Sequence, residues 1–139
     1  QIRKSIEETK IAGKVQHKLL EEIAELQAEQ LLAGNNGSPR TVVAVFPERD
    51  AVFIKMLALK LTAGKSDVVA LLASGTEQLT LVFAQSPGQK TNMGQLMKEV
   101  MIQLGGRGGG AADLAQGGLA GSFDLTRVKA ILQEVASRL

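Results

Sequence analysis

This chain of 139 residues has room for one domain with a hydrophobic core plus one appended element, and its 45% apolar and 22% charged residues are typical of soluble globular proteins. No apolar stretch approaches the roughly 18 residues that a membrane-spanning helix needs, and no signal-peptide pattern opens the chain, so we expect a cytoplasmic protein without membrane contact. The net charge of +2 is too small for a protein that holds nucleic acid by bulk charge, so any RNA contact must depend on a small, shaped site.

The chain lacks the side chains that most catalytic and metal sites require. It has no cysteine and one histidine, His17, which lies among lysine and glutamate residues on a predicted solvated helix face. Zinc sites of the usual His and Cys type and nucleophilic triads therefore lack their components. We expect no catalytic residue, no metal and no cofactor in this chain.

Residues 1–33 predict one long amphipathic helix. They contain no proline, and apolar residues recur at helical spacing at Ile11, Val15, Leu19, Ile23 and Leu26. The spacing drifts from strict heptads, which argues against a long parallel zipper and leaves three arrangements open: an antiparallel pair, packing against the domain, or a spacer. Because the pattern is already present at residue 1, without methionine or a capping residue, we expect this chain to be part of a longer protein.

Turn-forming residues at 34–40 separate this helix from the domain proper, which we expect to span residues 41–139. The pattern there predicts a strand at 41–46, a helix at 50–63, a hairpin of strands at 68–73 and 79–84, a helix at 93–104, a glycine loop, an edge strand at 113–118 and a helix at 124–139. Asp50, Asn92 and Asp124 are the predicted helix caps. The fold class is therefore α+β, a mixed sheet packed with helices in the order β-α-β-β-α-Gly loop-α, preceded by the long helix.

The glycine-rich segment is the main candidate for function. Between Gly105 and Gly121 the chain places eight of its 15 glycines, each of which costs more backbone entropy on ordering than any other residue. A flexible linker, backbone at positive φ, close packing between chain segments, or a run of N–H groups that binds an anion would each explain them. A dinucleotide fingerprint is excluded because a helix precedes the glycines, and a nucleotide phosphate loop because Ala111 and Ala112 stand where lysine and a hydroxyl residue are needed. Arg107 with neighbouring amides suits a single phosphate.

Four short motifs resemble those of one known family: Leu79-Thr-Leu-Val-Phe-Ala-Gln-Ser86, Asn92-Met-Gly94, Leu104-Gly-Gly-Arg-Gly-Gly-Gly110 and Asp113-Leu-Ala-Gln-Gly-Gly118. Residues 41–139 resemble the C-terminal DHH-associated domain of alanyl-tRNA synthetases and of long free-standing alanyl-tRNA editing proteins. The first two motifs look more like the editing protein. The chain departs from the family at Ala111-Ala112, where members commonly carry Arg-Pro, and it lacks the histidine that related phosphoesterases place after their glycines.

The resemblance implies a module that binds tRNA, with alanine-specific tRNA as the expected partner, and that joins two subunits into a homodimer. It also implies a zinc-dependent N-terminal domain, absent from this chain, that removes a wrongly attached amino acid. Three alternatives remain: the C-terminal domain of an alanyl-tRNA synthetase, the substrate-binding domain of a DHH-type phosphoesterase, and a purely structural dimerisation module. The candidate contacts to the RNA backbone are Gly105, Gly106, Arg107, Gly108, Gly109, Gly110, Asp113, Gln116, Lys65, Lys90 and Lys98.

Overall fold

The computed structural model describes residues 2–34, 40–63, 65–75 and 78–139. Its elements are α1 (Ile2–Ala33), β1 (Arg40–Phe46), α2 (Ala51–Thr62), β2 (Val68–Gly75), β3 (Leu79–Gln85), α3 (Met93–Leu104), β4 (Arg107–Gly110), β5 (Leu114–Leu119) and α4 (Leu125–Ser137). The strands form one sheet in the order β1-β2-β3-β5-β4, in which β1 is parallel to β2 and all other neighbours are antiparallel. The predicted α+β class and the antiparallel pairing of β2 with β3 are confirmed, whereas the predicted turn at 34–40 lies mostly outside the described residues.

Three helices begin at the predicted caps. Side-chain oxygens accept hydrogen bonds from backbone N–H groups one turn into each helix: Asp50 from Phe53 (3.1 Å), Asn92 from Gln95 (3.1 Å) and Asp124 from Thr126 (2.9 Å). These bonds satisfy donors that have no partner within the helix. α3 ends as predicted at Gly105, whose φ of 81° lies in the left-handed region that favours glycine.

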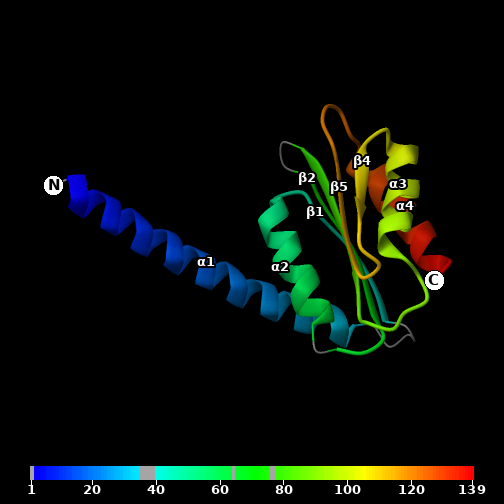
Figure 1. The fold of residues 1–139 in the computed structure, drawn as a ribbon, viewed down its shortest axis with the longest axis horizontal. Coiled ribbons are helices and arrows are strands. Elements are labelled where there is room, and N and C mark those ends of the chain that lie inside the picture. The colour runs from blue at the N-terminus through cyan, green and yellow to red at the C-terminus, as the bar shows by residue number, and fades with distance from the viewer. Residues whose placement is uncertain (1, 35–39, 64, 76–77) are drawn as a thin grey trace.

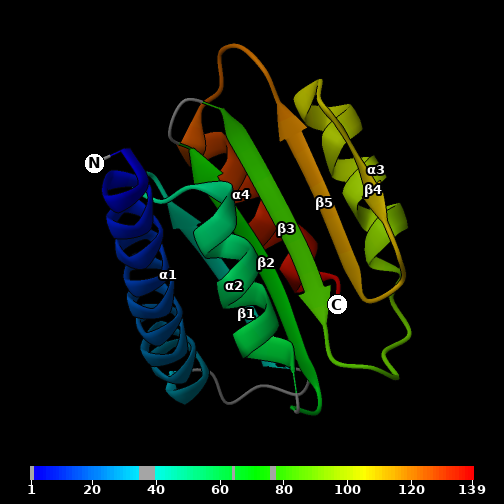
Figure 2. The ribbon, with the colours of Figure 1, turned by 60° about the vertical axis from the view of Figure 1, so that its left-hand side comes forward.

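The sheet is a layer between two groups of helices (Figures 1 and 2). α2 packs on one face over β2 and β3, and α1 packs against the outer side of α2. On the other face, α4 covers β1 and β2, and α3 lies against β3, β5 and β4. Because β2 is covered on both sides, residues 68–73 form a continuous apolar run in which no residue is more than 2% exposed.

The predicted glycine loop is a strand. Arg107–Gly110 forms β4 at the edge of the sheet and pairs with β5, from Arg107 opposite Gly118 to Gly110 opposite Ala115. The predicted edge strand at 113–118 is β5, which lies inside the sheet between β3 and β4. The strand at 113–118 is therefore confirmed, whereas its edge position and the loop at the glycines were wrong. Glycine has a low strand propensity, so no local pattern indicates β4, and β4 takes the edge of the sheet in place of β5.

Several glycines allow α3 and the two C-terminal strands to approach more closely than side chains would permit. A Cβ atom at Gly108 would lie 2.8 Å from both the Cγ of Met97 and the Cα of Gly117. At Gly110 it would lie 2.5 Å from a backbone oxygen of β5, and at Gly94, in α3, it would overlap the carbonyl group of Gly110. Close packing between chain segments, one of the four explanations that the sequence left open, therefore accounts for these glycines.

α1 contacts the domain through a different face from the one that its apolar spacing indicates. Among residues 15–33, whose side chains the structure describes, the buried ones are small or lie near the end of the helix: Ala24, Ala28 and Leu32. Four apolar side chains of the predicted face are 40% to 61% exposed: Val15, Leu19, Ile23 and Leu26. The side chain of Ile11, the fifth, lies outside the described part. Lys60 of α2 holds α1 by ion pairs of 3.0 Å to Glu21 and 2.9 Å to Glu25.

This ion-pair cluster predicts a pH window for the docking of α1. The hydrogen bond and charge of Lys60 lower the pKa of Glu21, and hydrogen bonds to Glu25 and Glu21 raise the pKa of Lys60. The Glu21 contribution is lost as the pH falls through its lowered pKa, and the Lys60 contribution is lost as the pH rises through its raised pKa. Docking is therefore expected to be strongest between these two values, with a modest effect because the pairs are partly exposed.

Lys60→Met is expected to broaden the distance distribution between spin labels on α1 and α2 and to remove its pH dependence. Cysteines at the exposed positions Gln16 and Val52 provide the labelling sites in a chain that has no cysteine of its own. Lys55→Met, which removes a charge that forms no salt bridge with any described residue, is the control. A Lys60→Met distribution as narrow as that of the control, at every pH, would contradict this role of the cluster.

Candidate nucleic-acid interface

One half of the sheet has a face that none of the described helices covers. α2 lies over β2 and β3, but β5 and β4 extend past it and leave an open surface on that side (Figure 2). The strand register places Arg107 opposite Gly118 and Gly109 opposite Gln116. Because paired residues share a face and alternate residues return to it, these four residues all lie on the open side. They lie beside Val82 of β3, which pairs with Gln116 and packs against the α2 core.

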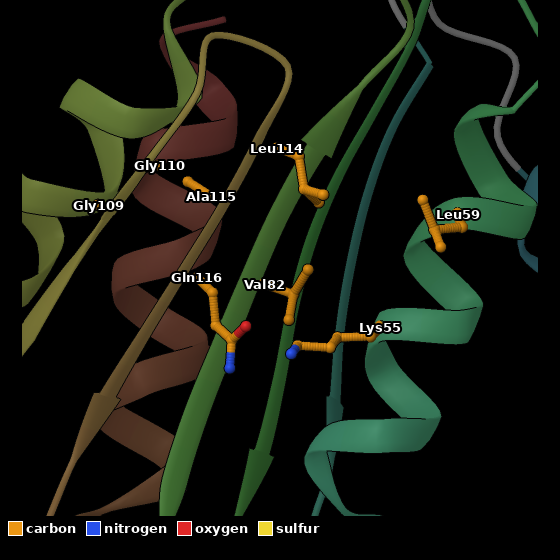
Figure 3. A pocket seen from close by; sticks show the side chains of 8 residues that line it. All are labelled: Lys55, Leu59, Val82, Gly109, Gly110, Leu114, Ala115 and Gln116. Atoms are coloured by element: carbon orange, nitrogen blue, oxygen red, sulfur yellow. The ribbon is translucent and has the colours of Figure 1, made fainter.

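Two adjoining hollows occupy this surface. The first, which we call the α2 groove, has a volume of about 330 Å³ and is lined by Lys55, Leu59, Val82, Gly109, Gly110, Leu114, Ala115 and Gln116 (Figure 3). The second, which we call the Arg107 groove, has a volume of about 520 Å³ and is lined by Gln78, Leu79, Thr80, Arg107, Gln116, Gly117, Gly118, Leu119 and Ala120. Gln116 lines both grooves and therefore joins them.

The lining of these grooves favours an anionic ligand. Lys55 and Arg107 are exposed cations, and no carboxylate is among the described lining residues. Within the described part of the chain, neither cation forms a salt bridge, whereas Lys60 on the same helix as Lys55 forms two. Gly109 and Gly118 present bare backbone between the polar side chains, which allows a sugar-phosphate backbone to approach closely.

The structure brings together five of the residues that the sequence indicated. Arg107, Gly109, Gly110 and Gln116 line the two grooves. The Lys98 side chain passes beside Gly109, since its Cε lies 3.4 Å from the position that a Cβ atom would take there. These residues form a patch at the β4 edge of the open face.

The other indicated residues lie elsewhere. Gly105 and Gly106 donate their N–H groups to the carbonyl oxygen of Met101, at 2.8 Å and 2.9 Å, so these two amides are engaged within the α3 terminus. Gly108 faces α3. Lys65 lies just before β2, and Lys90 lies just after β3. Both are at the end of the sheet opposite Arg107, so each is separated from Arg107 by a strand length of about 20 Å.

Asp113 is part of a structural hydrogen-bond network. The buried Gln85 side chain donates to Asp113 Oδ1 at 3.2 Å and to the carbonyl oxygen of Ala112 at 2.8 Å. The Gln85 backbone N–H also donates to the carbonyl oxygen of Asp113 at 3.0 Å. This network fixes the turn between β4 and β5, and so positions Gly110 and Leu114 at the rim of the α2 groove.

Sequence reasoning missed the contribution of α2 to this surface. Lys55 and Leu59 both line the α2 groove, and Leu59 is 53% exposed. One signal was present: Lys55 and Lys60 are the only charged residues in α2, which is otherwise apolar on most sides. Since Lys60 binds α1, Lys55 marks the remaining solvent-facing side of this helix.

Comparisons with known proteins agree with this architecture. Residues 38–139 match the DHHA1 domain family. The chain is 36% identical over 118 residues to an alanine–tRNA ligase of Methanosarcina barkeri, covering 80% of this chain and 12% of that protein. It is 31% identical over 133 residues to the corresponding ligase of Herminiimonas arsenicoxydans, covering 92% of this chain and 14% of that protein.

A solved structure shares the fold. The C-Ala domain of alanyl-tRNA synthetase from Aquifex aeolicus superposes with a TM-score of 0.62 at 30% identity and covers 74% of this chain and 96% of that domain. The present chain spans a small C-terminal part of the length of the curated ligases that it matches. Within the described residues, no helix is both long and apolar enough to cross a membrane. The family match over residues 38–139 and the resemblance of the C-Ala fold lead to one conclusion: this chain belongs to the DHHA1 domain family and is similar to the C-terminal domain of alanyl-tRNA synthetases.

Proposed function

We propose that this chain binds the sugar-phosphate backbone of tRNA, with alanine-specific tRNA as the partner, through the open face of β3, β5 and β4. The observation that carries the proposal is an uncovered sheet surface that presents Arg107, Lys55 and Gln116 without a carboxylate among its described lining residues. Cations bound to phosphates supply most of the affinity in such complexes, and amides and bare backbone fix the position of the strand. The similarity to alanine–tRNA ligases supports tRNA as the nucleic acid, and the proposal places the protein in the cytoplasm.

Mapping of amide chemical-shift changes tests this proposal. On addition of an alanine-specific tRNA transcript at low salt, resonances from β4, β5 and the Lys55 turn of α2 are expected to shift or broaden. Resonances of β1 and of α4, which lies on the opposite face, are expected to remain unchanged. Changes confined to β1 and α4, or no change at all, would refute the proposal.

The catalytic activity of the whole protein is a separate proposal, because this chain covers only 12% to 14% of the ligases described above. We propose a parent protein that hydrolyses mischarged tRNA(Ala) in a zinc domain outside this chain. The alternative is an alanine–tRNA ligase, and the curated relatives agree with it. Two residues of the motifs that resemble the editing protein have structural roles in this fold: Gln85 holds the β4–β5 turn, and Asn92 caps α3. These two residues therefore do not distinguish an editing protein from a ligase. ATP-dependent alanylation by the full-length protein would identify a ligase, whereas deacylation of mischarged tRNA without alanylation would identify an editing protein.

The exposed face of α1 supports a second function, self-association. Val15, Leu19, Ile23 and Leu26 form an apolar ridge that the domain leaves uncovered. The charges of the helix are also divided: residues 1–18 carry five basic and two acidic side chains, whereas residues 19–33 carry four acidic side chains and no basic one. An antiparallel pair of α1 helices would cover the two ridges and place each basic half against the acidic half of the other copy.

Leu19→Glu is expected to convert a dimer to a monomer, because it places a charge in the middle of the paired ridges. Sedimentation equilibrium of both proteins measures the change. His17→Glu, which adds the same charge at an exposed position on the side of α1 opposite the ridge, is the matched control and is expected to remain dimeric. A monomeric wild-type protein at every concentration tested would refute self-association.

A further inference from the structure

The α2 groove has the features of a binding site for a single flat, partly apolar group. Leu59 and Leu114 face each other across it, 53% and 45% exposed, although side chains of this size are usually buried. Figure 3 shows the Leu114 side chain above the sheet beside Val82 of β3, and the Leu59 side chain on the surface of α2 that faces them. The wall formed by Gly109 and Gly110 has no side chains, so a planar group can lie against the backbone there.

Polar groups occupy one end of this groove. The Lys55 side chain extends from α2 toward Gln116, and its amino group points to the side on which the Gln116 amide lies (Figure 3). A lysine amino group only donates hydrogen bonds, whereas a glutamine amide both donates and accepts. The complementary ligand therefore carries hydrogen-bond acceptors along one edge, together with an apolar or aromatic body.

The groove also continues into the proposed phosphate site. Gln116 belongs to both grooves. Arg107 lies opposite Gly118, which is two residues, or about 7 Å, beyond Gln116 along β5. A ligand with an anionic group in the Arg107 groove therefore has the next part of its structure within reach of the α2 groove. An RNA strand meets this condition, because each phosphate is followed by a base.

We infer that the α2 groove holds one unstacked purine base of the bound RNA, between Leu59 and Leu114, with Lys55 and Gln116 at its hydrogen-bonding edge. Guanine presents two adjacent acceptors on its major-groove edge, whereas adenine presents one acceptor and one donor. Because Lys55 only donates, guanine is bound more tightly than adenine. This inference rests on the proposed function and adds a base-reading site to its phosphate contacts.

The test uses single-stranded RNA pentamers that differ only in the central residue: guanosine, adenosine, uridine or an abasic ribose. Their affinities for the complete 139-residue chain are measured by fluorescence anisotropy at low salt. Guanosine is expected to bind about five- to tenfold more tightly than the abasic pentamer, the scale of partly burying one base against apolar side chains, with adenosine between them. Leu114→Ala is expected to remove the difference between guanosine and abasic pentamers without changing abasic affinity, and Lys55→Gln is expected to remove the preference for guanosine over adenosine.

The control variant is Ile102→Ala, which removes an 80% exposed apolar side chain from α3 and is expected to leave every affinity unchanged. The design separates failure of this inference from failure of the proposed function. If all four pentamers bind equally and Arg107→Ala weakens all of them, the phosphate contacts stand and the base site is refuted. If no pentamer binds, the base site and the phosphate contacts are both refuted. If an apolar peptide binds in the α2 groove and the guanosine pentamer does not compete with it, the groove holds a protein segment and the inference is overturned.

Discussion

Gly110→Ala is expected to destabilise the domain by about 3 kcal/mol, whereas Gly109→Ala, one residue away, should change the free energy of unfolding by less than about 1 kcal/mol. A Cβ atom at Gly110 would lie 2.5 Å from the carbonyl oxygen of Leu114 and 2.6 Å from the Cα of Ala115. Both atoms belong to the backbone of the paired strand and cannot move without disturbing the sheet. At Gly109 the nearest atom is the Cε of Lys98 at 3.4 Å, near the end of a flexible side chain.

Urea unfolding followed by circular dichroism measures both variants against the wild type. Gly117→Ala provides a third point, because the atoms nearest to its Cβ would be side-chain atoms of Met97 and Met101, at 2.7 Å and 2.9 Å. Methionine side chains adapt to changes in shape, so an intermediate loss is expected. Equal stability of the Gly109 and Gly110 variants would show that close packing is not the reason for the glycine sequence.

Arg107→Ala is expected to weaken the binding of alanine-specific tRNA by roughly tenfold at low salt, the effect of one charge-assisted contact to phosphate. Arg107 is exposed, lines the Arg107 groove and has no ion-pair partner in the described part of the chain. Its loss should therefore affect binding and leave folding nearly unchanged. The slope of log affinity against log salt concentration should also decrease by about one unit, because one fewer counterion is released.

Filter binding across a salt series measures both quantities. The matched control is Arg138→Ala, which removes the same charge from an exposed position at the end of α4, on the other face of the sheet. The control is expected to keep the wild-type salt slope. If both variants lose affinity equally, general charge and not the open face would account for binding, and if Arg107→Ala binds as well as the wild type, Arg107 does not contact the phosphates.

The helices of this fold and their limits were largely predictable, because their signals are local. Asp50, Asn92 and Asp124 each satisfy a donor within three residues along the chain, and the predicted starts of α2, α3 and α4 are confirmed. β2 was recognisable from its continuous apolar run, which a strand covered on both faces requires. These features depend on residues close together in sequence, and so a single sequence is sufficient to read them.

The candidate site was only partly predictable, because its members come from distant segments. Arg107 and Gln116 were indicated by their motifs, and the register of β4 with β5 places them on one face. Lys55 and Leu59 come from a helix some 50 residues earlier, and only the packing of α2 on the sheet brings them to the same groove. Conversely, Lys65 and Lys90 are cations like Lys98, but the topology carries them to the opposite end of the sheet.

The sequence by itself determined the α+β class, the helix boundaries, the absence of cysteine and of the residues for a His and Cys zinc site, and the resemblance to the DHH-associated domain. Only the tertiary structure decided that the glycines form an edge strand, that the apolar ridge of α1 faces away from the domain, and that half of one sheet face is open. The physical reason is the range of the interactions. Caps and apolar periodicity act within a few residues, whereas strand pairing and helix docking depend on which distant surfaces meet, and glycine carries no side chain that records its partner.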